Sequence, residues 1–114
     1  MILEVYGLWS PDLDPPLEGE GLPDDRTKFR VFIQVSLVEQ GQEDSEVFGF
    51  YVCSPSMLAQ TEPGTIITHT LVLNLFCWDT IRARVTKLLM HARSAITWDE
   101  VIEKLSGCLF HTDV

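Results

Sequence analysis

The sequence is poor in basic residues. It has 8 Lys and Arg against 17 Asp and Glu among its 114 residues, which gives a formal net charge of −9 at pH 7. Nucleic acid and anionic membranes repel such a chain, so we expect no direct binding to either. Hydrophobic residues nevertheless make up 46% of the chain and charged residues 22%, proportions that are typical of globular proteins. A packed core is therefore expected beneath an acidic surface.

The sequence also lacks a long apolar segment. The longest nearly apolar run, residues 71–78, contains Asn74 and is far shorter than the roughly 20 residues of a membrane-spanning helix. Residues 1–6 include no basic residue, and Glu4 interrupts their apolar character, which argues against a secretory signal. A length of 114 residues is usual for one compact domain. We therefore expect a single cytoplasmic domain covering residues 1–114.

Motifs typical of catalysis, metal binding or redox chemistry are missing as well. The three cysteines, Cys53, Cys77 and Cys108, are too widely spaced for a Cys-x-x-Cys motif and indicate free thiols in a reducing compartment. Cys53, Ser54, His69 and Cys77 could meet in space, but nothing in the sequence fixes the geometry of a nucleophilic site. No His-Glu-x-x-His, Gly-x-Ser-x-Gly or phosphate-binding glycine motif is present. We expect no enzymatic activity, no cofactor and no metal.

The acidic residues are concentrated in the first part of the chain. Residues 1–64 hold twelve acids and three bases, a net charge of −9, whereas residues 65–114 hold five of each. Such an uneven distribution steers basic partners to one part of the surface, although acidity can also serve solubility alone.

Most of these acids fall on two irregular segments. Residues 2–9 and 29–38 read as strands, and the stretch between them, about residues 10–26, is rich in proline and acid, which predicts a long loop. A third strand at 47–53 follows a polar segment at 39–46, which predicts a hairpin between it and 29–38. Within 29–38 the apolar residues alternate, although Phe32 and Val38 interrupt the polar face. Carboxylate pairs on such segments are more often solvated than catalytic. We therefore predict partner contacts at Asp12, Asp14, Asp24, Asp25, Glu43, Asp44 and Glu46.

The rest of the chain predicts a short helix, a strand and two further helices. Ser54 and Pro55 are favourable at the start of a helix. Residues 65–76 read as a long strand with a kink near His69. A helix is expected from Asp79, acting as its N-cap, with an apolar stripe that begins at Ile81 and Val85.

The last helix has the strongest start signal. Thr97 followed by Glu100 forms a capping box, and Ile96 and Val101 are placed for a hydrophobic staple. Gly107 is expected to end this helix, and residues 109–111 could add an edge strand. The irregular order of elements predicts an α+β fold: an antiparallel sheet with two C-terminal helices packed on one face and one short helix between strands.

Four stretches of the chain form a distinctive series. They are Ser-Pro-Asp-Leu-Asp at 10–14, Phe-x-Phe-x-Val-Cys-Ser-Pro at 48–55, Leu-Val-Leu at 71–73 leading to Trp-Asp at 78–79, and Thr-Trp-Asp-Glu-Val at 97–101. In this order they resemble the immunity protein 8 family of bacterial polymorphic toxin systems. Two features depart from the family pattern. Met57 stands where relatives often have tryptophan, and the tail 109–114 keeps only Asp113 of a common aromatic and acidic ending.

The resemblance implies an α+β fold, no catalytic activity and a cognate toxin encoded nearby. A toxin that acts in the cytoplasm, such as a nuclease, would present a basic cleft that an acidic protein can occupy. Two alternatives remain open. One is a small acidic regulatory or chaperone-like module that binds a basic protein without inhibiting an enzyme, and the other is a domain that binds a small molecule.

Overall fold

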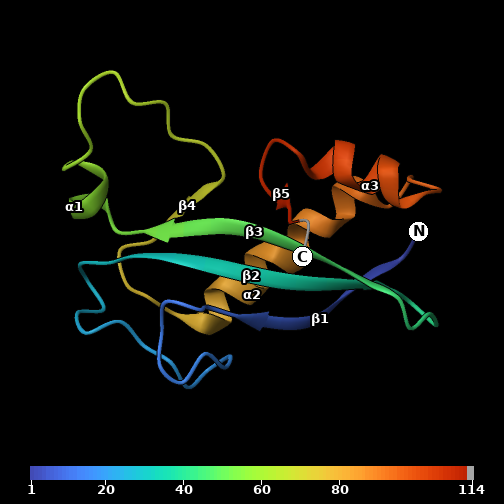
Figure 1. The fold of residues 1–114 in the computed structure, drawn as a ribbon, viewed down its shortest axis with the longest axis horizontal. Helices are drawn as coiled ribbons and strands as arrows, with labels where there is room; N and C mark the ends of the chain where they lie inside the picture. Colours follow the sequence, from blue (N-terminus) through green and yellow to red (C-terminus); the bar gives the residue numbers. More distant parts are fainter. Residues whose placement is uncertain (113–114) are drawn as a thin grey trace.

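The computed structural model describes residues 1–112, and Asp113 of the predicted tail lies outside this part. A five-stranded sheet forms the centre of the molecule (Figure 1). In chain order the elements are β1 (Leu3–Trp9), β2 (Arg30–Glu39), β3 (Ser45–Cys53), α1 (Pro55–Leu58), β4 (Thr70–Val72), α2 (Trp78–Leu88), the 3-10 helix η1 (Leu89–Ala92), α3 (Trp98–Leu105) and β5 (Phe110–His111).

The sheet is mostly antiparallel. Its strands follow the order β1, β2, β3, β4, and β5 also pairs with β3. Only the pairing of β3 with β4 is parallel. Two C-terminal helices and a short helix between strands complete the fold, so the predicted α+β class is confirmed.

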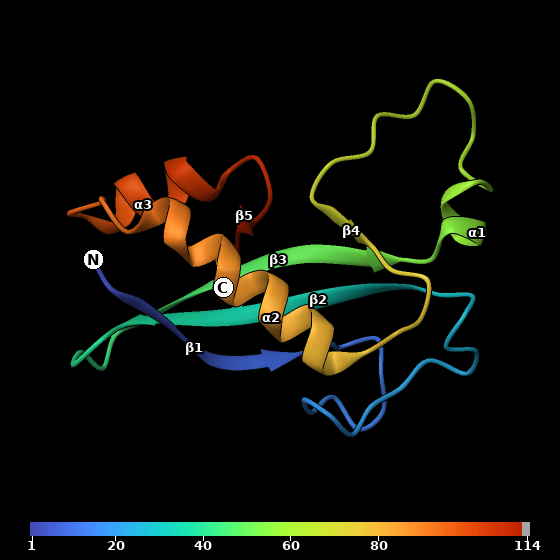
Figure 2. The same cartoon turned by 180° about the vertical axis from the view of Figure 1, so that it is seen from behind.

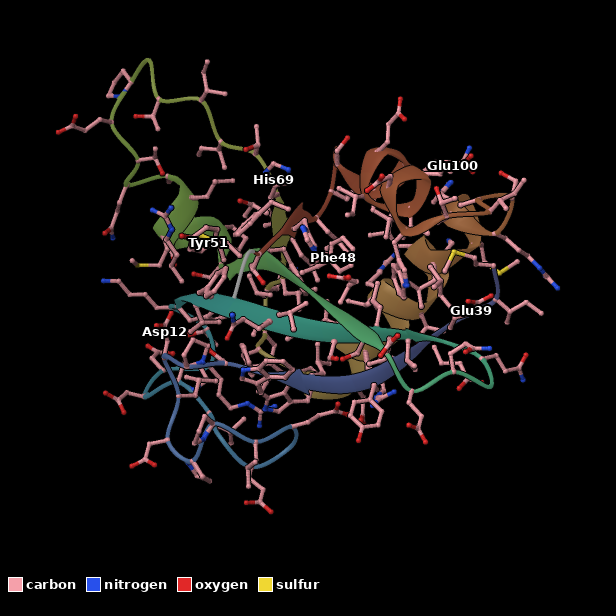
Figure 3. The ribbon with its side chains drawn as sticks, turned by 45° about the vertical axis from the view of Figure 1, so that its right-hand side comes forward. Asp12, Glu39, Phe48, Tyr51, His69 and Glu100 are labelled. Atoms are coloured by element: carbon pink, nitrogen blue, oxygen red, sulfur yellow. The ribbon has the colours of Figure 1, made fainter. Side chains whose placement is uncertain are left out.

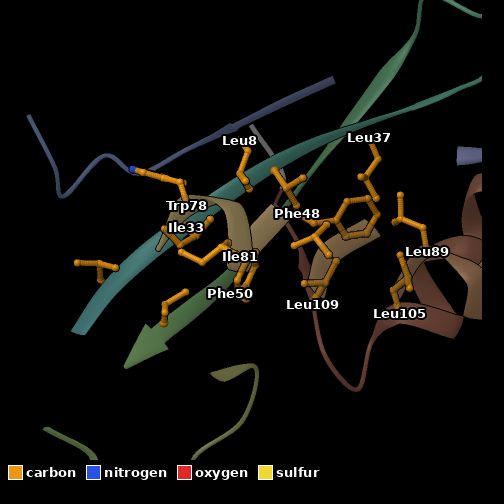
Figure 4. Packing of buried hydrophobic residues seen from close by; sticks show 14 of the residues in the cluster. Leu8, Ile33, Leu37, Phe48, Phe50, Trp78, Ile81, Leu89, Leu105 and Leu109 are labelled. Carbon is orange, nitrogen blue, oxygen red and sulfur yellow. The ribbon is translucent and has the colours of Figure 1, made fainter. Parts of the chain in front are cut away.

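The core lies between the sheet and α2. Alternate β2 residues, among them Ile33, Val35 and Leu37, are fully buried, because a strand directs successive side chains to opposite faces. Ile81 and Val85 of the predicted helical stripe are buried in the same core cluster. Figure 4 shows Ile81 within this cluster. Helix α2 passes behind the sheet in Figure 1 and in front of it in Figure 2. Among residues 1–112 no helix covers the other face, which we call the open face.

The strand predicted at residues 65–76 is much shorter than expected. Only Thr70–Val72 forms a strand, whereas Ile66 and Ile67 are 88% and 42% exposed on a projecting loop. His69 has a φ of 53°, a left-handed conformation that breaks an extended strand, at the place where a kink was predicted. Two consecutive strands that pair in parallel, such as β3 and β4, need a crossover connection between them. Residues 54–69 form this crossover, so only a short segment after it pairs with β3.

The start of α2 also differs from the prediction. Cys77 is the N-cap residue and Trp78 is the first helical residue, so Asp79 lies in the first turn instead of capping the helix. The carboxylate of Asp79 still lies near the positive end of the helix dipole, where an acid is favourable. The indole of Trp78 turns into the protein, where it is 6% exposed.

At the start of α3 one half of the predicted capping arrangement is correct. Thr97 Oγ1 accepts a hydrogen bond from the amide of Glu100 at 3.3 Å, as expected of an N-cap. The carboxylate of Glu100, however, accepts from the amide of Ile96 at 2.8 Å instead of from that of Thr97. Ile96 is 81% exposed while Val101 is fully buried, so the predicted staple between them is wrong.

Thr97→Ala is expected to lower the free energy of unfolding by about 1 kcal/mol, because alanine cannot accept the Glu100 amide. Thr86→Ala, an exposed change inside α2, is the matched control and should not destabilise the protein. Denaturant unfolding monitored by circular dichroism measures both. Equal stability of Thr97→Ala and the wild type would contradict a structural role for this cap.

Candidate functional site

The loop between β1 and β2, residues 10–29, is held firmly against the start of α2. The indole Nε1 of Trp78 donates to the carbonyl of Gly21 at 2.7 Å. The guanidinium of Arg26 donates to the carbonyl of Phe76 at 2.9 Å, and the Phe76 amide donates back to the carbonyl of Arg26 at 2.8 Å. The predicted acidic loop is therefore an ordered part of the structure.

An ion pair ties the middle of this loop to α2. Arg82 contacts both carboxylate oxygens of Glu18, at 2.8 and 3.1 Å. This hydrogen bonding raises the pKa of the Arg82 guanidinium above its ordinary value. The pair is partly exposed, so its contribution to stability is small, but its two-point geometry fixes the direction in which the loop runs.

Four of the predicted contact residues line one hollow in the surface. Asp12 and Asp14 approach it from one arm of the loop, and Asp24 and Asp25 from the other. The hollow has a volume of about 500 Å³, and two basic residues, Lys28 and Arg30, also border it, so that its four aspartates outnumber its bases. We call it the acidic hollow. It brings Asp12 and Asp14 together with Asp24 and Asp25, which lie ten or more positions later in the sequence.

Asp12 and Asp25 also support the backbone. Asp12 lies just beyond the end of β1, and its Oδ2 accepts a hydrogen bond from the amide of Phe32 in β2 at 2.8 Å. Asp25 Oδ1 accepts from the hydroxyl and amide of Thr27, at 2.6 and 2.8 Å, and these bonds lower the pKa of Asp25. These two carboxylates therefore help to hold the loop in its conformation. Asp14 and Asp24 make no side-chain hydrogen bond to another residue within 1–112.

The other three predicted residues lie far from the hollow. Glu43 and Asp44 are exposed in the turn between β2 and β3. The ten residues of β2 separate this turn from the hollow by roughly 30 Å, and Figure 3 shows Asp12 and Glu39 at opposite ends of the sheet. The seven predicted residues thus form two separate acidic regions.

The position of Glu46 differs from the predicted hairpin, in which this residue belongs to the turn. β3 begins at Ser45, so Glu46 belongs to the strand and pairs with Leu37 instead of lying in the turn. Its carboxylate is 2.7 Å from His111 Nε2 in β5. Glu46 therefore helps to hold β5, the predicted closing strand, which the structure confirms as an edge strand paired with β3.

The open face carries four aromatic residues that the sequence did not single out as a group. They are Trp9 in β1, Phe32 in β2, Tyr51 in β3 and Phe110 in β5, each partly exposed. We call this group the aromatic strip. The one sequence signal was Phe32, an apolar residue on the face of its strand that alternation predicts to be polar. The others could not be grouped without the strand register.

The three cysteines are free thiols in different environments. Cys53 is buried, Cys77 is partly exposed and Cys108 is exposed. Burial raises the pKa of Cys53, whereas hydrogen bonding to the hydroxyl and amide of Thr80 lowers that of Cys77. Within residues 1–112, no three His, Cys, Asp or Glu side chains are grouped so as to hold a metal ion. No helix in that range is long and apolar enough to span a membrane.

Charge differs between the two layers of the molecule. Three of the eight basic residues, Arg82, Arg84 and Lys87, lie on α2. Arg93 follows η1, and Lys104 lies on α3. Residues 1–64, which form β1, β2, β3, α1 and the loops between them, carry a net charge of −9. The sheet side is therefore the acidic side, and the helix side has nearly balanced charge.

Comparison with known proteins identifies one family. The model of the family described as immunity protein 8 matches residues 20–110, which is most of the chain and includes β2, β3 and all the helices. No curated protein and no solved structure matches. Immunity proteins of this kind are non-enzymatic inhibitors, each of which neutralises a cognate toxin. The chain belongs to the immunity protein 8 family.

Proposed function

We propose that this immunity protein neutralises a toxin that acts in the cytoplasm on nucleic acid, such as a nuclease, by occupying the basic surface of that toxin. The observation that carries the proposal is the acidic hollow, where four aspartates from two arms of one loop line a single depression. Enzymes that act on nucleic acid present basic clefts, to which such a hollow is complementary in charge.

The structure of the loop supports binding without a large rearrangement. Its hydrogen bonds to Trp78 and Phe76 hold the backbone in place, so little conformational entropy would be lost on association. The acids of the turn, Glu43 and Asp44, lie too far away to share one small contact with the hollow. Their role in the proposal is to contribute to the field that steers the toxin toward the protein.

Charge reversal tests the proposal. Asp14→Lys/Asp24→Lys is the best variant, because neither carboxylate supports the backbone within the described residues. We expect its association rate with the purified toxin to fall about tenfold at 0.1 M salt, with a smaller fall in 1 M salt, where the Debye length shrinks from about 10 to about 3 Å. The melting temperature should barely change. Glu43→Lys/Asp44→Lys should slow association less.

The matched control places the same change of charge on the helix side. Asp99→Lys/Glu103→Lys alters two exposed acids of α3 and leaves the loop intact. Binding kinetics measured by surface plasmon resonance should then resemble those of the wild type. An association rate that falls equally in this control and in Asp14→Lys/Asp24→Lys would show that total charge matters and the hollow does not.

A further inference from the structure

The four residues of the aromatic strip fall in two neighbouring rows across the open face. Pairing places Trp9 opposite Gln34, Gln34 opposite Gly49 and Gly49 opposite Phe110, which makes one row across four strands. In the next row Phe32 pairs with Tyr51. Paired residues project from the same face, so these side chains share one surface.

The rings lie against one another because Gly49 leaves room for them. Phe32 and Phe110 stack with centroids 5.7 Å apart and planes 14° apart. A Cβ at Gly49 would be 2.6 Å from Phe32 and 2.9 Å from Phe110, so both rings lie over the glycine. Phe32 also contacts Tyr51 at 5.3 Å between centroids, and Trp9 Nε1 donates to Gln34 Oε1 at 3.0 Å. The result is a preorganised and partly apolar surface.

An open sheet face is normally polar, because water covers it. Here the face carries an aromatic strip, and in the described part of the chain no helix lies over this face of the sheet (Figure 1). Tyrosine and tryptophan are enriched among the residues that dominate binding energy in protein interfaces, and an apolar patch with a polar rim marks an interaction site. The chemistry of the strip thus points to a protein partner.

The strip and the acidic hollow are continuous. Asp12, which lines the hollow, accepts from the amide of Phe32 in the strip at 2.8 Å. Arg30 borders the hollow and lies 5.1 Å from the centre of the Tyr51 ring. Figure 3 shows Asp12 and Tyr51 at the same end of the sheet. A partner seated on the rings would also reach the aspartates.

We propose that the aromatic strip is the docking surface for the toxin, and that it receives an arginine-bearing basic segment. Arginine side chains stack on the faces of aromatic rings, and the contact of Arg30 with Tyr51 shows that this surface accepts such packing. The neighbouring aspartates bind further cations of the same segment. Charge complementarity selects this side, because the acidic residues of 1–64 lie on the sheet and its loops. The inference rests on the proposed function and assigns the contact surface for it.

Two kinds of variant test the proposal against the cognate toxin domain, purified in an inactivated form. Tyr51→Thr removes a ring but keeps a residue that favours strands, and we expect its Kd to rise about 10- to 100-fold. Val47→Lys removes no ring. It adds a cation to the open face, where Val47 pairs with Ser36, and should also weaken binding at least about tenfold by repulsion.

Each variant has a control on the helix side. Met90→Thr removes an apolar side chain that is 60% exposed on η1, and Thr86→Lys adds a cation to an exposed position of α2. Both should bind as the wild type does. Circular dichroism verifies folding, and Val47→Lys keeps the proposal testable if Tyr51→Thr is unstable.

The outcomes separate this proposal from the function on which it rests. A wild-type chain that neither binds the toxin nor protects growth overturns the proposed function and the docking surface together. A wild-type chain that protects, while Tyr51→Thr and Val47→Lys bind with unchanged Kd, overturns the docking surface alone. Weaker binding of these two variants with unchanged controls supports it.

Discussion

Trp78→Ala is expected to lower the free energy of unfolding by about 3–5 kcal/mol, the usual cost of truncating a buried tryptophan. Trp78 is 6% exposed and packs edge-on against Phe76, with ring centroids 5.3 Å apart. Its indole also provides a hydrogen bond from the start of α2 to the loop, at Gly21. The substitution therefore leaves a cavity and releases the loop at the same time.

Two measurements separate these consequences. Trp78→Phe keeps most of the apolar volume but loses the bond to Gly21, so it should cost less than Trp78→Ala in denaturant unfolding. Trypsin cleavage after Arg26 or Lys28 should be faster in both variants, because release of the loop exposes its backbone. Trp98→Ala, at a partly exposed position of α3, is the control and should leave the cleavage rate unchanged. Unchanged cleavage in Trp78→Ala would contradict the anchoring role.

Gly49→Val is expected to cost about 1–3 kcal/mol of stability, because a side chain there meets rings on the open face. Valine normally suits a strand, so the sign of the effect opposes intrinsic propensity. Gly107→Val is the matched control, since a Cβ at Gly107 meets no atom within 4 Å. Thermal unfolding compares the two variants.

A double variant identifies the cause of this destabilisation. Gly49→Val/Phe110→Ala removes one of the two rings that crowd the new side chain, so its total cost should be less than the sum of the single costs. Additive costs would show that the valine is accommodated without displacing Phe110. The stacking on which the proposed docking surface depends would then have another origin.

Signals that depend on neighbours in the sequence were predictable. The alternation in β2, the cap at Ser54 and the cap at Thr97 each depend on residues a few positions apart, and the structure contains all three. The predicted hydrogen-bond partner of the Glu100 carboxylate was wrong by one residue, because this side chain can reach the amide of Ile96 or that of Thr97. Local patterns therefore predicted most of the elements and the α+β class, although not the length of β4.

Features that depend on distant residues were not predictable. β4 is short because a crossover precedes it and because β5, almost 40 residues later, takes part of the same edge of β3. The aspartates gather around one hollow because the loop is held by Trp78, 57 positions from Gly21. Composition predicted that acidic side chains matter, but it could not separate the hollow from the hairpin. The use of these residues as contacts stays a prediction.

The position of β1 bears on how copies of the chain behave toward one another. β1 is the outermost strand on its side of the sheet, and in residues 1–112 no strand pairs with its outer edge. Such an edge can template aggregation by strand addition. Here the register shifts between Val5 and Gly7, and Glu4 is exposed beside this irregularity. A bulged edge with a charge is a poor template, so β1 favours solubility when the protein accumulates.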